Sequence, residues 1–339
     1  MKKIIIFILI AALMLLSCKN NSTNVDTSSD NNSPGNTGGD NNNGNNGGST
    51  VTPEELEKYG IDIATATTEN IEKALIKYEA DHKGEYKLIF KGNSTTQYDW
   101  LKGLSIAGLI NEISLKDINI TITFEHVNFP NNILNPYILG GSQNLNENIV
   151  KVILPDTITT IGNNAFFCSN LTNVNIPKGL TIISDKSFSR INMKTLEFPN
   201  TLQTIGAYAF SQSKLESIVI PNSVTSIGKN AFESCENLIK VTLPNNLTIL
   251  EEFIFTSCYA LQSITIPASV KEIKTFAFYY AKALETVTFL SKTPPTIGDY
   301  VFDGTALKTI YVPQGSQKQY ETLKGKSGIP DTIEIIEQQ

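Results

Sequence analysis

The sequence predicts an α/β fold in which a solenoid of short repeated units follows a small module of helices and strands. Three observations lead to this prediction. A proline recurs every 22 or 23 residues between residues 155 and 267, apolar residues hold fixed positions around it, and the preceding region alternates helical and strand-like patterns. Self-similarity at a period of this length is the signature of stacked repeat architectures.

The repeats align on their prolines, which are Pro155, Pro177, Pro199, Pro221, Pro244, Pro267 and Pro313. The last gap is 46 residues and holds two units, with Leu290 in place of the missing proline. Apolar residues stand six, three and one positions before the proline, an Ile or Leu six positions after it, and a Phe eleven positions after it. One unit cannot bury these residues alone, so we expect the units to stack around one continuous core.

Each repeat is expected to contribute one short strand that ends at the proline, which has no N–H to donate to a neighbouring strand. Successive strands then form a parallel sheet with a spacing of about 4.8 Å. Glycines seven or eight positions after the proline are expected to supply a turn with an unusual φ. They are Gly162, Gly206, Gly228 and Gly298. Other repeats have Ser184, Glu251 or Lys274 in this column, so the turn does not require glycine everywhere.

A period of about 20–29 residues with an L-x-x-I-x-I core is that of leucine-rich repeats. The fuller pattern L-x-x-I-x-I-P-x-S-V-T-x-I-G-x-x-A-F-x-x-C resembles the BspA-like class of bacterial surface leucine-rich repeat proteins over about residues 149–313, most closely in 215–235 and 261–278. The predicted fold is therefore a leucine-rich repeat solenoid with units of 22–23 residues and one short parallel strand per repeat, preceded by a small α/β module. The resemblance implies surface display and adhesion to host matrix proteins or other cells, and it leaves the ligand open.

Residues 1–17 have the features of an export signal. Lys2 and Lys3 precede an apolar run of 13 residues, which is too short to span a bilayer. The end of this signal resembles a bacterial lipobox, which implies that Cys18 is acylated and becomes the mature N-terminus. The alternative is an ordinary secretory signal with an accidental cysteine. Residues 18–51 are rich in Asn, Gly and Ser and have too few apolar residues to offset the entropy of ordering, so they are predicted to form a disordered tether.

Three further segments complete the predicted organisation. Residues 52–126 form a helix–strand–helix–strand module that opens on a capping box at Thr52 and Glu55. Residues 127–313 form the solenoid, in which 127–148 is an imperfect first turn. Residues 314–339 are expected to cover the open end of the solenoid as a cap, with a polar helix and a last strand.

The residues four and two positions before the proline should point away from the core, and together they define the strand face. This face is rich in Thr, Ser and Asn, and extended solenoid surfaces of this kind are used to dock partners. The candidate ligand-binding residues are Asn173, Asn175, Glu197, Val219, Lys240, Thr242, Thr265, Thr288 and Tyr311. The alternative is that β-branched residues stand here only because they fit a pleated surface.

The sequence predicts no catalytic residue, no metal site and no cofactor. Glu197 is the only carboxylate on the strand face, whereas glycoside hydrolysis needs a pair of carboxylates. No histidine follows His126, so the repeats cannot form a Ser–His–Asp or Cys–His arrangement. Residues 52–126 also lack a convergent acid, base or nucleophile. We therefore expect a protein that is not an enzyme.

The cysteines after the tether stand in near-equivalent columns of the repeats, at Cys168, Cys235 and Cys258. Adjacent repeats bring Cys235 and Cys258 within the range of a disulfide, which an exported protein permits. Three thiols would leave one unpaired, and the family resemblance implies a small buried residue in this column. We expect buried free thiols rather than a disulfide, and no zinc site.

The net charge of −6 argues against a nucleic-acid partner, because such binding needs a basic patch. The expected partners are host or cell-surface proteins or glycans, and a membrane held through the N-terminal lipid. The predicted function is that of an exported, lipid-anchored and surface-exposed binding protein of the bacterial cell envelope, with adhesion as its role. The alternative is an architectural envelope protein that packs against neighbouring copies and has no soluble ligand.

Overall fold

The computed structural model describes residues 50–94, 105–140, 147–167 and 169–338. Residues 51–339 form a compact unit of their own. The predicted signal peptide at residues 1–17, the lipidation site Cys18, the tether up to residue 49 and Cys168 lie outside the described residues.

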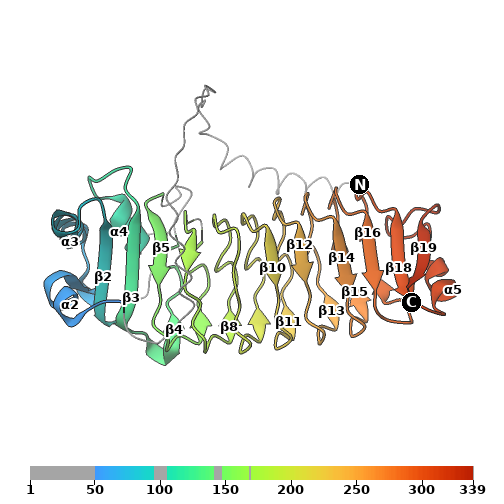
Figure 1. The fold of residues 1–339 in the computed structure, drawn as a ribbon, viewed down its shortest axis with the longest axis horizontal. Helices are drawn as coiled ribbons and strands as arrows, with labels where there is room; N and C mark the ends of the chain where they lie inside the picture. Colours follow the sequence, from blue (N-terminus) through green and yellow to red (C-terminus); the bar gives the residue numbers. More distant parts are fainter. Residues whose placement is uncertain (1–49, 95–104, 141–146, 168, 339) are drawn as a thin grey trace, which may run out of the picture. The chain divides into compact units, whose positions relative to one another are not determined.

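A first row of parallel strands runs along the unit and is divided into separate sheets (Figure 1). Its first sheet has the order β1-β2-β3-β5-β7, and these strands are Gly60–Asp62, Tyr86–Asn93, Ile120–Asn128, Ile149–Ile153 and Asn173–Val174. After a break, the row resumes with the pair β10 (Ser217–Val219) and β12 (Lys240–Thr242). After a second break it ends with a sheet of β14 (Ser263–Ile266), β16 (Thr286–Phe289), β18 (Thr309–Pro313) and β19 (Glu334–Gln338). Parallel pairing in all of these sheets confirms the predicted fold class.

The N-terminal module and the repeats share the first sheet. Strand β3 pairs with β5 of the first repeat, with Ile122 opposite Val152. Residue 126, at which the sequence analysis ended the module, lies inside β3. One cluster of buried apolar residues extends from Ile61 to Ile335. The module is therefore continuous with the solenoid in both sheet and core.

A second row of two-residue strands follows the prolines (Figure 1). Its members are β4 (Ile133–Leu134), β6 (Thr160–Ile161), β8 (Ile182–Ile183), β9 (Thr204–Ile205), β11 (Ser226–Ile227), β13 (Ile249–Leu250), β15 (Glu272–Ile273) and β17 (Thr296–Ile297). Each holds the Ile or Leu six or seven positions after the proline or its equivalent, which packs against the core. The sequence predicts one strand per repeat, and the structure adds this second one. Two residues are too few to produce a strand period in a sequence.

The repeats are joined a third time along their turns. The backbone N–H groups nine, eleven and thirteen positions after the proline donate to carbonyls of the next repeat. Tyr208, for example, donates to Lys229 (N···O 3.0 Å) and Phe210 donates to Ala231 (2.8 Å). We call the solvent-facing surface over these turns the turn face.

The unusual φ angles lie at other residues than the glycines, so the prediction for the glycines was wrong. Gly162, Gly206, Gly228 and Gly298 all have φ outside the left-handed region. Positive φ occurs nine and thirteen positions after the proline, and the residues at the ninth position are Asn164, Lys186, Tyr208, Asn230, Phe253 and Phe276. Glycine is needed instead for close approach, because a Cβ on Gly228 would lie 2.5 Å from the backbone nitrogen of Ala207 in the preceding repeat.

The phenylalanines eleven or twelve positions after the proline form a continuous stack inside the solenoid. They are Phe166, Phe188, Phe210, Phe232, Phe255, Phe278 and Phe302, and each is fully buried. Their ring centroids lie 5.0–5.5 Å apart and neighbouring planes differ by 1–21°. This spacing is close to that of parallel strands, so the rings and the backbone ladders fit the same axial repeat.

Short helices lie at both ends of the unit (Figure 1). The N-terminal ones are α2 (Pro53–Tyr59), η1 (Ile63–Thr65), α3 (Thr68–Asp81), α4 (Ile106–Asn111) and η3 (Pro130–Asn132). The predicted capping box is confirmed, since the Thr52 hydroxyl accepts from Glu55 N–H and the Glu55 carboxylate accepts from Thr52 N–H. At the other end, α5 (Gln317–Tyr320) and η4 (Glu321–Leu323) lead to β19, which pairs with β18. The buried Tyr320 donates its hydroxyl to Ser291 O (2.8 Å), which ties this segment to the last repeat.

Two cysteines belong to the core. Cys235 and Cys258 are free and fully buried, as predicted. Their thiols donate to the carbonyls of Phe210 and Phe232 in the preceding repeats (S···O 3.1 and 3.2 Å). Burial raises the pKa of Cys235 to about 12 and holds the pKa of Cys258 well above its usual value. Both residues are therefore protonated at neutral pH and pack the turns.

Replacing Gly228 by alanine is expected to lower the free energy of unfolding by about 1–3 kcal/mol, because the added methyl group overpacks the contact with Ala207. Gly179→Ala is the matched control, since a Cβ there meets nothing within 4 Å. Urea unfolding of residues 51–339 measures both changes. Equal effects of the two substitutions would show that the glycine column is not set by close approach.

The two core thiols are expected to be inert in the folded protein. In residues 51–339 with Cys168→Ser, a thiol reagent such as Ellman's reagent at pH 8 should modify neither Cys235 nor Cys258 until urea unfolds the chain. Thiolate is the reactive form, and burial suppresses it. Both thiols should then react. Rapid reaction of the native protein would contradict their burial, and failure of the unfolded chain to react would reveal a disulfide.

Candidate functional site

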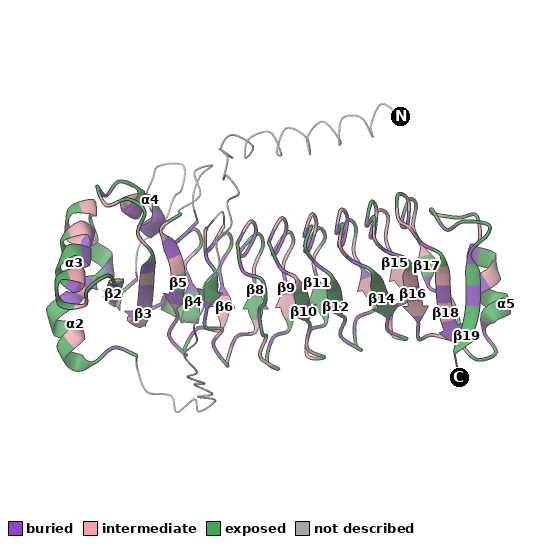
Figure 2. Cartoon of the chain, turned by 45° about the horizontal axis from the view of Figure 1, so that its top comes forward, coloured by how far each residue is buried: buried purple, intermediate pink, exposed green. Residues whose placement is uncertain are grey.

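The strand face is produced by the alternation of side chains along the first row of strands. In β14, Ile264 and Ile266 are buried whereas Ser263 and Thr265 are exposed. The same division holds along the row, and Figure 2 shows buried and exposed residues in every repeat. The residues predicted to point outward are all exposed or half-buried.

In-register pairing arranges the outward residues in rows along the solenoid. One row is Ser263–Thr286–Thr309, and the row beside it is Thr265–Thr288–Tyr311. In the β10–β12 pair, Ser217 lies opposite Lys240 and Val219 lies opposite Thr242. Val219 is 64% exposed, more than any other large apolar side chain among the described residues. Because β12 and β14 are neighbouring elements, the structure brings Val219, Lys240, Thr242, Thr265, Thr288 and Tyr311 onto one surface.

The hydroxyl groups of these rows are not used by the fold. Among the described residues, the side chains of Thr242, Thr265 and Thr288 make no hydrogen bond. Hydroxyls elsewhere in the repeats behave differently: Thr181 donates to Thr159 O (3.0 Å) and Ser269 donates to Leu247 O (2.7 Å), each in the preceding repeat. The strand face therefore offers hydroxyl donors and acceptors to solvent or to a ligand.

The other predicted residues lie where the row of strands is interrupted. The Asn175 amide accepts from Leu154 N–H (2.7 Å) and donates to Leu154 O (3.0 Å), so it replaces a backbone pairing beyond the end of β7. One acceptor and one donor of this amide are thereby used within the chain. Asn173 begins β7, and Glu197 lies in the break between β7 and β10. The structure places Asn173, Asn175 and Glu197 apart from the continuous rows.

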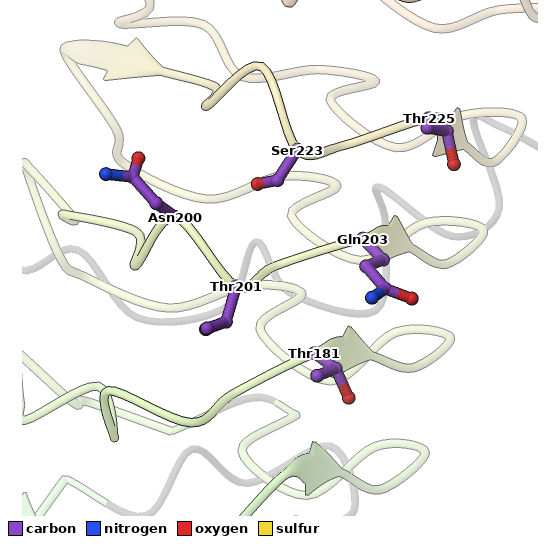
Figure 3. Close-up of a pocket in the computed structure, with 6 residues that line it drawn as sticks. All are labelled: Thr181, Asn200, Thr201, Gln203, Ser223 and Thr225. Atoms are coloured by element: carbon purple, nitrogen blue, oxygen red, sulfur yellow. The ribbon is translucent and has the colours of Figure 1, made fainter.

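A shallow polar recess lies between the two rows of strands, which the sequence analysis missed. It has a volume of about 400 Å³ and is lined by Thr181, Asn200, Thr201, Gln203, Ser223 and Thr225 (Figure 3). All six side chains are uncharged. Thr201 donates to Lys178 O or Leu180 O (2.8 Å each), whereas the buried Ser223 hydroxyl has no partner among the described residues. Polar residues recur one, two and four positions after the proline, and this pattern in the sequence could have predicted a polar surface here.

A cluster of aromatic side chains on the turn face was also missed. Phe253, Phe276 and Tyr300 stack with centroids 4.9 and 5.3 Å apart. Tyr279 packs edge-on against Phe276 and Tyr280 (5.1 and 4.6 Å). Burial raises the pKa of Tyr279, with smaller contributions from Tyr280 and Asp303. The sequence feature that could have predicted this cluster is an aromatic residue nine or ten positions after the proline, or its equivalent, in three successive repeats.

The described part of the chain contains no group of three or more His, Cys, Asp or Glu side chains that could hold a metal ion. Within the same residues, no helix is long and apolar enough to cross a membrane.

Comparisons with solved structures identify bacterial repeat proteins. A leucine-rich repeat protein from Bacteroides ovatus is 33% identical, with 49% of this chain and 44% of that protein covered and a TM-score of 0.47. A leucine-rich repeat protein from Eubacterium ventriosum is 23% identical over 69% of each chain, with a TM-score of 0.44. A leucine-rich cell surface protein from Faecalibacterium prausnitzii is 25% identical over 62% of each chain, with a TM-score of 0.36. The chain thus spans less than half of the length of the Bacteroides ovatus protein.

No curated protein matches the sequence. The family model described as a BspA type leucine-rich repeat region matches in six copies, over residues 101–216 and 203–323. These matches cover the first row of strands from β3 to β18, the second row, the stacked phenylalanines and the turn face. The chain belongs to the BspA-type leucine-rich repeat family.

Proposed function

We propose that this protein is an exported, lipid-anchored binding protein of the bacterial cell surface, which adheres to host matrix proteins or other cells through its strand face. The observation that carries the proposal is the set of hydroxyl side chains, aligned on the β10–β12 pair and on β14, β16 and β18, that make no hydrogen bond within the described residues. They are Ser217, Thr242, Ser263, Thr265, Thr286, Thr288 and Thr309.

Such a surface suits binding for a physical reason. Stacked repeats hold the hydroxyl groups at a spacing of about 4.8 Å along the solenoid, and β-branched side chains have few rotamers to lose. A partner therefore meets a preorganised array, and little entropy is lost on its side of the interface. The exposed Val219 and the half-buried Tyr311 add apolar contact to the hydroxyl rows.

The N-terminal sequence supports display at a membrane. Acylation of Cys18 would bury lipid chains at roughly 0.8 kcal/mol per methylene group. A flexible linker as long as residues 18–51 has a typical end-to-end distance of about 30 Å. Together these features would hold the repeats close to the membrane and leave the strand face free to meet a partner.

The architectural alternative would require copies of the protein to associate with each other. The C-terminal strand β19 is the last strand of its sheet and would be the natural place for such contact. It carries the exposed Glu334 and Glu337, and the Glu337 carboxylate accepts from Gln317 N–H (3.0 Å). Charged side chains on an edge strand oppose the addition of another strand, so the chemistry of this edge favours binding over self-assembly.

Binding of residues 51–339 to immobilised matrix proteins and glycans is expected to be saturable and to fall at least tenfold when Thr242, Thr265 and Thr288 are all changed to Lys. The lysines remove the hydroxyls and add bulk at the centre of the strand face. Surface plasmon resonance measures the affinities, and thermal unfolding checks that the variant is folded.

The matched control changes Thr157, Thr248 and Thr332 to Lys, which adds the same charge at exposed positions outside the strand face. It should bind like the parent chain. Binding that survives the strand-face substitutions would move the site to another surface. The absence of binding to any probe would favour the architectural role.

A further inference from the structure

The aromatic cluster of the turn face is accessible to solvent although its rings pack on each other. Tyr280 and Tyr300 are 44% and 45% exposed, and Phe253 and Phe276 are half-buried. Monomeric proteins seldom leave contiguous aromatic surface without a partner. We call Phe253, Phe276, Tyr279, Tyr280 and Tyr300 the aromatic patch.

The backbone conformation at this patch is energetically unfavourable for aromatic residues. Phe253, Phe276, Tyr280 and Tyr300 have φ of 59°, 62°, 57° and 57°. A bulky residue in this region is strained, whereas Asn tolerates it well. Asn164 and Asn230 occupy the same column as Phe253 and Phe276 in other repeats. Ring stacking between Phe253, Phe276 and Tyr300 offsets part of this strain.

The N-terminal half of the turn face shows what its aromatic rings can hold. The Arg190 guanidinium lies over the Phe167 ring, with Cζ 5.6 Å from the centroid. The Lys186 ammonium lies over the Tyr208 ring at 5.4 Å. In the aromatic patch, by contrast, no lysine or arginine of the described residues lies over a ring; at its margin, Lys282 lies over Tyr259 at 4.7 Å.

Carboxylates accompany the exposed tyrosines of the patch. Asp299 precedes Tyr300, and its carbonyl accepts from Phe276 N–H (3.1 Å). The Asp303 carbonyl accepts from Tyr280 N–H (2.8 Å). Neither carboxylate forms an ion pair with another described residue. Both acidic residues thus adjoin the patch through their backbones. The Asp303 carboxylate lies beside Gly328 and helps to raise the pKa of Tyr279.

We propose that the aromatic patch binds a cationic segment of a partner protein, whose Lys or Arg side chains lie over Tyr280 and Tyr300 and pair with Asp303 and Asp299. A cation over an aromatic ring is attracted by the electron density of its face, and the nearby carboxylates add charge complementarity. A neutral glycan would use the rings but would leave both carboxylates without a partner. This surface is separate from the strand face and provides a second site on the same repeats.

The test uses residues 51–339 and a fluorescent twelve-residue peptide of Arg, Gly and Ser, with Gln in place of every Arg in the control peptide. Fluorescence anisotropy should show saturable binding of the Arg peptide that weakens with salt, and no binding of the Gln peptide. The double variant Tyr280→Ser, Tyr300→Asn should lose at least tenfold in affinity. Ser and Asn are native to these columns at Ser257 and Asn230, so the variant should fold, which thermal unfolding will verify.

Two controls separate the patch from general acidity. Tyr208→Asn removes a turn-face tyrosine outside the patch and should leave binding unchanged. Asp299→Asn with Asp303→Asn should weaken binding, whereas Asp156→Asn with Glu236→Gln, which removes the same charge elsewhere, should not. Equal binding by the parent chain and the Tyr280, Tyr300 variant would overturn the proposal. The proposal would also be overturned if the parent chain bound a glycan but not the Arg peptide, and the Tyr280, Tyr300 variant lost that glycan binding. Loss of matrix binding in the strand-face lysine variant would leave these results unaffected, so the two surfaces are tested independently.

Discussion

The structure depends on the axial contact between one repeat and the next. The stacked phenylalanines, with centroids 5.0–5.5 Å apart, and the backbone hydrogen bonds along three lines of the repeat require the same spacing. A parallel ladder has a spacing of about 4.8 Å, and offset aromatic rings stack at a similar distance. Because both contacts are satisfied together, equivalent residues of successive repeats must fall into rows.

This constraint explains which positions are fixed. The phenylalanine is buried in each repeat, and Gly228 approaches the preceding backbone so closely that a methyl group would clash. The position nine residues after the proline has a left-handed backbone conformation in successive repeats, but its side chain varies. It is Asn, Lys, Tyr or Phe in different repeats. The fold thus specifies where the side chains of the turn face stand and leaves their chemistry free to vary.

The same constraint makes the protein a scaffold for extended surfaces. Repeats interact only with their neighbours, so substitution on one outer face has little effect on the others. The strand face presents hydroxyl rows. On the turn face, Lys186 and Arg190 lie over aromatic rings in the N-terminal half, whereas the rings of the aromatic patch stack on each other. Two surfaces of different chemistry can therefore coexist on one core.

The sequence by itself determined the repeat, the stacked core and the outward positions of the first strand. The apolar residues before each proline alternate with polar ones, and this pattern recurs in every repeat, so it can be recognised in the sequence. Thr242, Thr265 and Thr288 lie where the alternation predicts outward-pointing side chains. It also determined the buried thiols of Cys235 and Cys258. These features follow from periodic burial, which is a local property of the chain.

Only the tertiary structure decided the features that arise between repeats. The two-residue strands of the second row exist because a neighbour completes their hydrogen bonds, and the glycines are required by the backbone of the preceding repeat rather than by their own φ. The Asn175 amide is occupied by Leu154, a residue 21 positions away. The aromatic patch likewise joins Phe253, Phe276 and Tyr300 from three repeats. A contact of this kind is set by stacking geometry, which no single repeat contains.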